Sequence, residues 1–180
     1  TLGHEDQLRW FTEPCGLTHA RVLRVNSPFD YKRQAVLFVP RDMVPPQDPS
    51  HTEQVSLLAQ QVVSALGGRT LVLTTTLRAL RSIGEHLKQA FEDNPGLEVL
   101  IQGEGSKREL MDRFRDESDE QTPVGRVLVA AASFWEGFDV PGQALQAVII
   151  DKLPFPPPND PMVQARSDDL QSQGRKPFTD

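Results

Sequence analysis

The chain has 180 residues, 38% of them hydrophobic and 24% charged, and a formal net charge of −6. This length and composition are typical of one globular domain with its own core. They exclude a membrane-spanning helix, since no apolar run approaches the ~20 residues that one needs. The acidic balance argues against tight DNA binding by this chain alone. No signal peptide is recognisable, so we expect a cytoplasmic protein with no membrane partner, and Thr1 at the start predicts a piece of a longer chain.

The first third of the chain predicts mixed elements. Residues 1–17 predict a short helix, and residues 20–25 and 34–39 read as strands on either side of a turn. The spacing of Ser50 and Glu53 predicts a capping box that opens a helix with a one-sided apolar stripe. Gly67 and Gly68 then end this helix.

The rest of the chain alternates short apolar runs with amphipathic helical patterns. Alternation of this kind predicts an α/β fold with a mostly parallel sheet that is covered on both faces. The expected strands are 71–73, 97–101, 127–132 and 145–150, and the expected helices are 77–91, 106–120 and one that starts at Asp160-Pro161.

An aromatic and acidic cluster separates the last two expected strands. Phe134 and Trp135 lie beside Glu136, Gly137 and Asp139, directly after a buried apolar run. In an open α/β sheet the carboxyl ends of the strands form the ligand-binding edge. This cluster therefore predicts a functional loop.

Four strings resemble one known family, in the family's own order. They are SPFDYKRQAVLFVP, LVLTTTLRAL, LIQGEGSKRELMDRFR, and ASFWEGFDVPG with VIIDKLPFPPPNDP after it. Together they resemble the DinG/XPD branch of superfamily-two DNA helicases, in particular the bacterial DinG and YoaA type. The resemblance implies a RecA-like (P-loop NTPase-like) three-layer α/β/α fold. It further implies that residues 1–180 form an incomplete second, C-terminal motor domain, with residues 1–17 leading in from the first.

The same resemblance implies an activity for the whole protein. It would be an ATP-dependent helicase that moves 5′ to 3′ on single-stranded or forked DNA in repair. Its partners would be single-stranded DNA and its own N-terminal motor domain, which would hold most of the ATP and Mg²⁺. The sequence contains no G-x-x-x-x-G-K-[ST], no DEAH-like box and no Q-x-x-G-R-x-x-R string. Phosphoryl transfer needs the groups that these motifs supply, so we expect no catalytic residue here and no ATP hydrolysis by the chain alone.

The resemblance also implies roles for individual residues. Glu136, Gly137 and Asp139 would face ATP, with Asp139 toward the ribose or a bridging water. Alternatives stay open at this stage: core packing for the two aromatic residues, a simple cap or salt bridge for Glu136, helix capping for the threonines, and solvated charges for the basic residues. The residues expected to contact DNA are Thr74, Thr75, Thr76, Arg78, Gln102, Lys107, Arg108, Ser133, Phe134 and Trp135.

Cysteine and histidine are sparse. Cys15 is the single cysteine, so an iron–sulfur cluster could be held only elsewhere in a longer chain, and the four histidines show no ligand spacing. The missing motifs and the acidic charge keep a second hypothesis open. In it, the chain is a non-motor α/β domain that binds nucleic acid or a protein without ATP.

Overall fold

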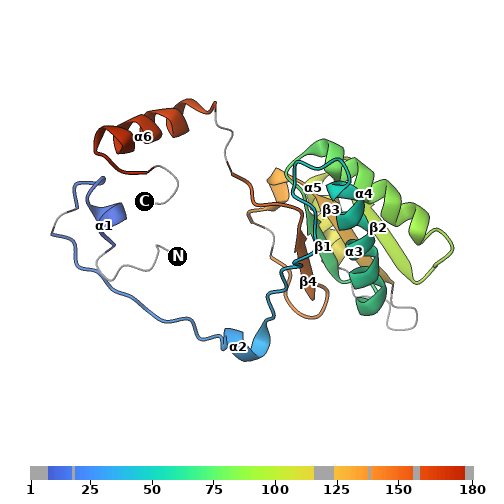
Figure 1. The fold of residues 1–180 in the computed structure, drawn as a ribbon. Coiled ribbons are helices and arrows are strands. Elements are labelled where there is room, and N and C mark those ends of the chain that lie inside the picture. Colours follow the sequence, from blue (N-terminus) through green and yellow to red (C-terminus); the bar gives the residue numbers. More distant parts are fainter. Residues whose placement is uncertain (1–7, 18, 116–123, 138, 156–158, 177–180) are drawn as a thin grey trace. The chain divides into compact units, whose positions relative to one another are not determined.

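The structure, a computed structural model, describes residues 8–17, 19–115, 124–137, 139–155 and 159–176 (Figure 1). The chain divides into two compact units, residues 1–41 and residues 42–180. Each unit is described by itself below.

The first unit contains two short helices in its described part. They are α1, Arg9–Thr12, and α2, Tyr31–Gln34. The prediction of strands at 20–25 and 34–39 is wrong for this structure, since no strand forms in the described residues up to Arg41. A strand exists only where its backbone pairs with another, and here Leu23 and Val36 are 86% and 93% exposed. Their apolar pattern alone could not supply a pairing partner.

The second unit is built on a four-stranded parallel sheet in the order β2-β3-β1-β4. The expected strands are all present, with ends shifted by at most a few residues. In register, Thr70 of β1 pairs with Val127 of β3 on one side and with Ala147 of β4 on the other. The strands are β1, Thr70–Leu73; β2, Leu97–Ile101; β3, Gly125–Ala130; and β4, Ala147–Ile150.

Helices cover both faces of this sheet, as predicted (Figure 1). Helices α3, His51–Leu66, and α4, Leu77–Ala90, pack on one face, and α5, Lys107–Arg115, packs on the other. Strand side chains alternate between the two faces. The first cluster, on the α3 and α4 side, contains Val72, Ile83, Val127 and Val129. The second cluster, on the α5 side, contains Leu71, Leu100, Leu110, Phe114, Leu128 and Phe134.

Strand β4 ends the sheet in the described part of the chain. Its side chains Val148 and Ile150 are 51% and 45% exposed. They lie in register beside Leu71 and Leu73, which are buried in the second cluster. Helix α5 packs on β3, so β4 keeps an apolar surface on this side.

Close backbone contact joins the end of α3 to the start of β3. Gly67 caps α3 with a left-handed φ of 59°, as the Gly-Gly pair predicted. A Cβ atom at Gly125 would lie 1.7 Å from the carbonyl oxygen of Gly67. The predicted capping box at the start of α3 is wrong, because the Ser50 side chain caps nothing and instead donates to Asp48 at 2.7 Å.

A charged cluster ties β2 to β3 and α5. Glu98 of β2 accepts hydrogen bonds from Arg126 of β3, at 2.9 Å, and from Arg113 of α5. Burial acts to raise the pKa of Glu98, but the hydrogen bonds from the two arginines outweigh it, so the pKa lies below its ordinary value of 4.5. The ionised form of Glu98 therefore contributes to stability at neutral pH.

Helix α6, Pro161–Ser172, begins where the sequence predicts. The Asp160 side chain accepts hydrogen bonds from the N–H groups of Met162 and Val163, at 2.8 and 3.1 Å, and Pro161 occupies the first turn. None of the described residues of α6 is buried. Among the described helices, none is long and apolar enough to cross a membrane.

Candidate functional site

The predicted functional segments meet at one edge of the sheet. Because all four strands are parallel, the segments after β1, β2, β3 and β4 leave from the same carboxyl edge. Backbone hydrogen bonds hold their first residues together. Thr74 donates to Ala130 at 2.8 Å, Gln102 to Val129 at 2.9 Å, and Asp151 to Leu73 at 3.1 Å.

Three threonines form the segment after β1, and their hydroxyls differ. Thr76 caps α4, since its Oγ1 accepts from the Ala79 N–H at 3.2 Å, so the capping alternative is confirmed for this residue. Thr74 is fully buried, and its hydroxyl donates to the Thr76 carbonyl at 3.2 Å. The hydroxyl of Thr75 is buried without a hydrogen-bond partner in the described part of the chain. Thr75 is therefore the member of the trio whose hydroxyl hydrogen-bonds to none of the described residues.

Gln102 joins the segment after β2 to the segment after β3. Its Oε1 accepts a hydrogen bond of 2.7 Å from the N–H of Ala131, a residue only 6% exposed. Further along, the Ser106 hydroxyl accepts from the Glu109 N–H at 3.2 Å and so caps the start of α5. The amide of Gln102 thus helps to hold the neighbouring loop in place.

The two aromatic residues after β3 have different surroundings. Phe134 is 2% exposed and belongs to the second cluster, so the packing alternative holds for it. Trp135 is half-buried against the same cluster, and its indole N–H donates to the Thr74 carbonyl at 3.3 Å. The segment after β3 is thereby attached to the segment after β1.

The residues predicted to face ATP come directly after Trp135 in the chain. Glu136, Gly137 and Asp139 are all exposed. Gly137 has a φ of 69°, and a Cβ there would meet no described atom within 4 Å. Glycine is favoured at this position by its left-handed backbone conformation. Gly137 therefore lies beside two exposed carboxylates, with open space where a side chain would be.

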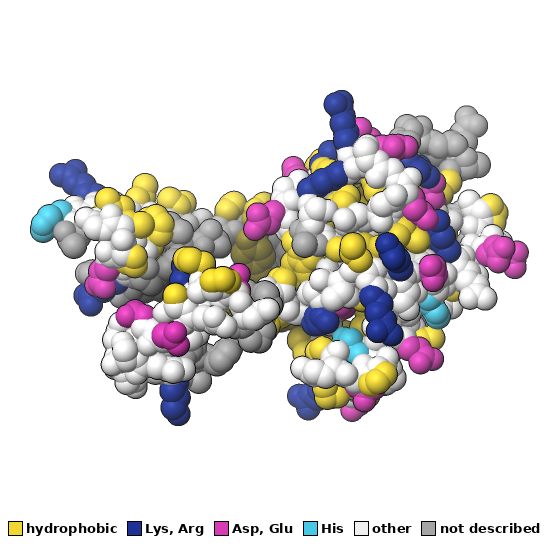
Figure 2. Space-filling model, turned by 90° about the horizontal axis from the view of Figure 1, so that it is seen from above, with side chains coloured by type: hydrophobic (Ala, Val, Ile, Leu, Met, Phe, Trp, Pro, Cys, Tyr) yellow, Lys and Arg dark blue, Asp and Glu magenta, His cyan; other side chains and the backbone are white. Residues whose placement is uncertain are grey.

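Basic side chains from two helices border these segments. Arg78, in the first turn of α4, is exposed. Arg108 has a side chain that is 93% exposed, and among the described residues it forms a 3.7 Å ion pair with Asp112 on its own helix, which matches the solvated alternative. Lys107 differs from both, since its ammonium donates to the Ser133 carbonyl. Figure 2 shows basic and acidic side chains interspersed on the face that it presents.

One residue at this edge was given no role by the sequence. Asp151 follows β4, and its carboxylate accepts from the Lys152 N–H at 2.7 Å. Burial raises the pKa of Asp151, while the Lys152 N–H and the positive charges of Lys152 and His51 act in the opposite direction. His51 places its two ring nitrogens 2.9 Å from the Val44 carbonyl and 3.1 Å from the Asp151 carbonyl. The only signal in the sequence was an acidic residue directly after an apolar strand.

A layered parallel sheet with its polar loops gathered at the carboxyl edge is an open α/β architecture and is consistent with a RecA-like domain. The chain belongs to the helicase C-terminal domain family, whose pattern matches residues 59–180. This membership confirms the resemblance seen in the motifs. In the described residues no group of His, Cys, Asp or Glu is arranged to hold a metal ion.

Relatives cover almost the entire chain. It is 38% identical over 99% of its length to the ATP-dependent DNA helicase YoaA of Escherichia coli. It is 36% identical over 88% of its length to the ATP-dependent helicase DinG of Mycobacterium tuberculosis. It is also 30% identical over 99% of its length to a Bacillus subtilis protein named 3′-5′ exonuclease DinG. The chain spans only 26%, 22% and 19% of these three relatives, respectively.

Proposed function

We propose that this chain is the second motor domain of an ATP-dependent DNA helicase that acts in the cytoplasm. The observation that carries the proposal is the joining of the segments after β1, β2 and β3 into one edge by the hydrogen bonds of Thr74, Gln102 and Trp135. An edge joined in this way moves as one body. A domain closing on a neighbour would then shift its DNA contacts and its nucleotide contacts together.

The DNA grip is proposed for the polar and aromatic side chains at this edge. Helix N-termini and hydroxyls suit phosphate groups, and a partly exposed indole suits a base. Phe134 and Lys107 are left out of the proposed grip, since the first is buried and the second donates to loop carbonyls. The grip comprises Thr75, Thr76, Arg78, Gln102, Arg108, Ser133 and Trp135, with Thr74 holding the strand end behind them.

The ATP contacts are proposed for Glu136, Gly137 and Asp139. When bound, ATP supplies the phosphoryl group whose transfer to water drives domain movement. In this chain Gly137 would allow close approach, and the two exposed carboxylates would orient the nucleotide or a water bound to it. Most of the ATP and Mg²⁺ contacts would come from the first motor domain, with residues 1–17 leading in from it. Any iron–sulfur cluster would also lie outside this chain.

The test uses the full-length protein with single-stranded DNA. Asp139→Ala should lower DNA-stimulated ATP turnover about tenfold or more, which corresponds to about 1.4 kcal/mol of transition-state stabilisation. Asp93→Ala, a change at an exposed aspartate beyond α4, is the matched control and should keep wild-type turnover. Wild-type turnover in Asp139→Ala would remove Asp139 from the ATP site. A full-length protein that binds DNA without any ATP turnover would favour the non-motor alternative.

Two finer parts of the proposal have their own measurements. Movement from 5′ to 3′ predicts unwinding of a partial duplex with a 5′ single-stranded tail and none of a duplex with a 3′ tail. The reverse preference would refute the direction. The 180-residue chain alone should turn over no ATP above a protein-free blank, because it lacks the phosphate-binding and arginine motifs.

A further inference from the structure

Both ends of α5 are attached to the loop that follows β3. At the first residue of the helix, the Lys107 ammonium donates to the Ser133 carbonyl, lies 3.5 Å from the Glu136 carbonyl and is 5.1 Å from the centre of the Phe134 ring. At the last residue, the Arg115 guanidinium donates to the Asp139 carbonyl through Nε, at 2.8 Å, and through a second nitrogen.

The helix between these two attachments packs on the sheet through buried side chains. Leu110 and Phe114 are 1% and 2% exposed in the second cluster, which also contains Phe134. The loop therefore touches α5 at three levels: a lysine at one end, a buried ring in the middle and an arginine at the other end. Charged donors to backbone carbonyls form strong, directed hydrogen bonds. Here they replace the regular backbone pairing that an irregular loop lacks.

The two side chains of α5 hold different parts of the loop that follows β3. Lys107 holds Ser133, which belongs to the proposed DNA grip, and also approaches Glu136. Arg115 holds Asp139, which belongs to the proposed ATP contacts. One rigid helix thus connects the DNA half of the loop to its ATP half.

We infer that Lys107 and Arg115 are positioning residues through which α5 couples DNA binding to ATP turnover. This inference rests on the proposed function. A shift of the loop at Ser133 when DNA binds would move α5 through Lys107, and Arg115 would carry the movement to Asp139. Neither side chain needs to touch DNA or ATP for this coupling.

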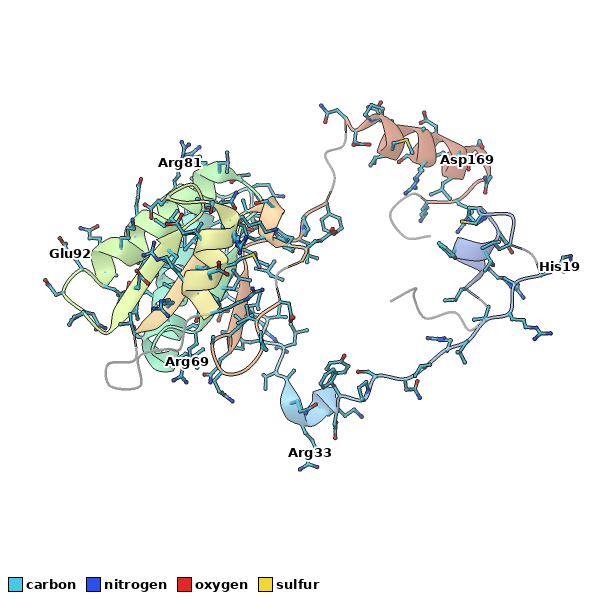
Figure 3. All side chains as sticks on the ribbon, turned by 180° about the vertical axis from the view of Figure 1, so that it is seen from behind. His19, Arg33, Arg69, Arg81, Glu92 and Asp169 are labelled. Carbon is cyan, nitrogen blue, oxygen red and sulfur yellow. The ribbon has the colours of Figure 1, made fainter. Side chains whose placement is uncertain are left out.

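The experiment uses the full-length protein and measures the ratio of ATP turnover with and without single-stranded DNA. In Arg115→Gln and in Lys107→Gln this ratio should fall about fivefold or more, within the usual range of coupling between sites. Lys107→Arg keeps a cationic donor and should restore the ratio. Arg81→Gln removes an exposed arginine that points outward from α4 (Figure 3), and serves as the matched control with an unchanged ratio.

DNA binding by fluorescence anisotropy at several salt concentrations separates positioning from direct contact. Arg115→Gln should bind single-stranded DNA within about twofold of the wild type. If Lys107→Gln instead lowers the slope of log affinity against log salt by about one, Lys107 contacts a phosphate and the inference is overturned for it. Thermal unfolding identifies a variant that fails to fold. If Arg115→Gln does not fold, Arg115→Lys decides, because a single ammonium cannot reproduce the donation from two nitrogens to the Asp139 carbonyl. Arg115→Lys should then still lower the ratio, and an unchanged ratio would overturn the role of Arg115.

Two further outcomes separate the inference from the proposed function. A wild-type protein whose ATP turnover is not stimulated by DNA would refute both the proposed motor function and the coupling role of α5. A stimulated wild type whose Gln variants keep the full ratio would sink the coupling role of α5 alone and leave the motor function standing.

Discussion

Gln102→Met tests whether Gln102 holds the site together. The methionine keeps the length of the side chain but removes the oxygen that accepts the Ala131 N–H at 2.7 Å. Ala131 is 6% exposed, so water cannot easily replace the lost acceptor. A buried donor left without a partner costs about 1–3 kcal/mol. For a chain of this size each kcal/mol shifts the melting temperature by about 2–4 °C, which predicts a loss of about 2–12 °C.

The assay is urea and thermal unfolding of the 180-residue chain, followed by far-UV circular dichroism. Gln102→Glu is the matched control, because a carboxylate accepts the same hydrogen bond and should keep the wild-type midpoint to within about 0.5 kcal/mol. A Met variant as stable as the wild type would refute the role assigned to this hydrogen bond. DNA contact would then be the one role left to Gln102.

Three further changes probe the packing around the site. Gly125→Ala places a Cβ 1.7 Å from the Gly67 carbonyl oxygen, and a backbone atom cannot move aside as a side chain can. We therefore expect the free energy of unfolding, measured in urea, to fall by about 3 kcal/mol or more. A wild-type urea midpoint would contradict this. In Gly84→Ala the new Cβ would lie 2.5 Å from the Cδ1 atom of Ile101, an atom that Ile101→Val removes. The loss of unfolding free energy caused by Gly84→Ala should therefore be smaller in an Ile101→Val background, with a coupling of about 1 kcal/mol in a double-mutant cycle. Additive effects of the two changes would contradict this contact. Glu98→Gln should lose about 1 kcal/mol at pH 7. Because the pKa of Glu98 is lowered in the folded state, this difference should vanish as the pH falls well below 4.5, and a pH-independent difference would rule out an ionic origin.

Sequence reasoning succeeded where a single segment carries its own signal. The buried strands and the amphipathic helices α3 and α4 each show a periodic apolar pattern, and the strand ends follow from it. The same reasoning failed at residues 20–25 and 34–39, whose apolar pattern is equally strand-like. Strand formation there depends on a pairing partner, which no local pattern reveals.

Part of the candidate site could be predicted from the sequence and part could not. Parallel strands place their following loops at one edge, so the meeting of Thr74, Gln102 and Ser133 at that edge could be predicted from the alternation of elements. The contacts that fix the loops could not. Lys107 and Arg115 bind backbone carbonyls, and a carbonyl is present at every residue, so no side-chain spacing marks its partner. The strand order, which inserts β3 between β1 and β2, likewise leaves no trace in a single sequence.

Strand β4 has a consequence for the solubility of the isolated domain. Val148 and Ile150 present an apolar strip on the last strand of the sheet in the described part of the chain. An open edge of this kind is a template on which another copy can add a strand. We therefore expect the isolated domain to associate through β4 where no other surface covers this strand. Val148→Lys should raise the concentration at which the isolated chain stays monodisperse in light scattering.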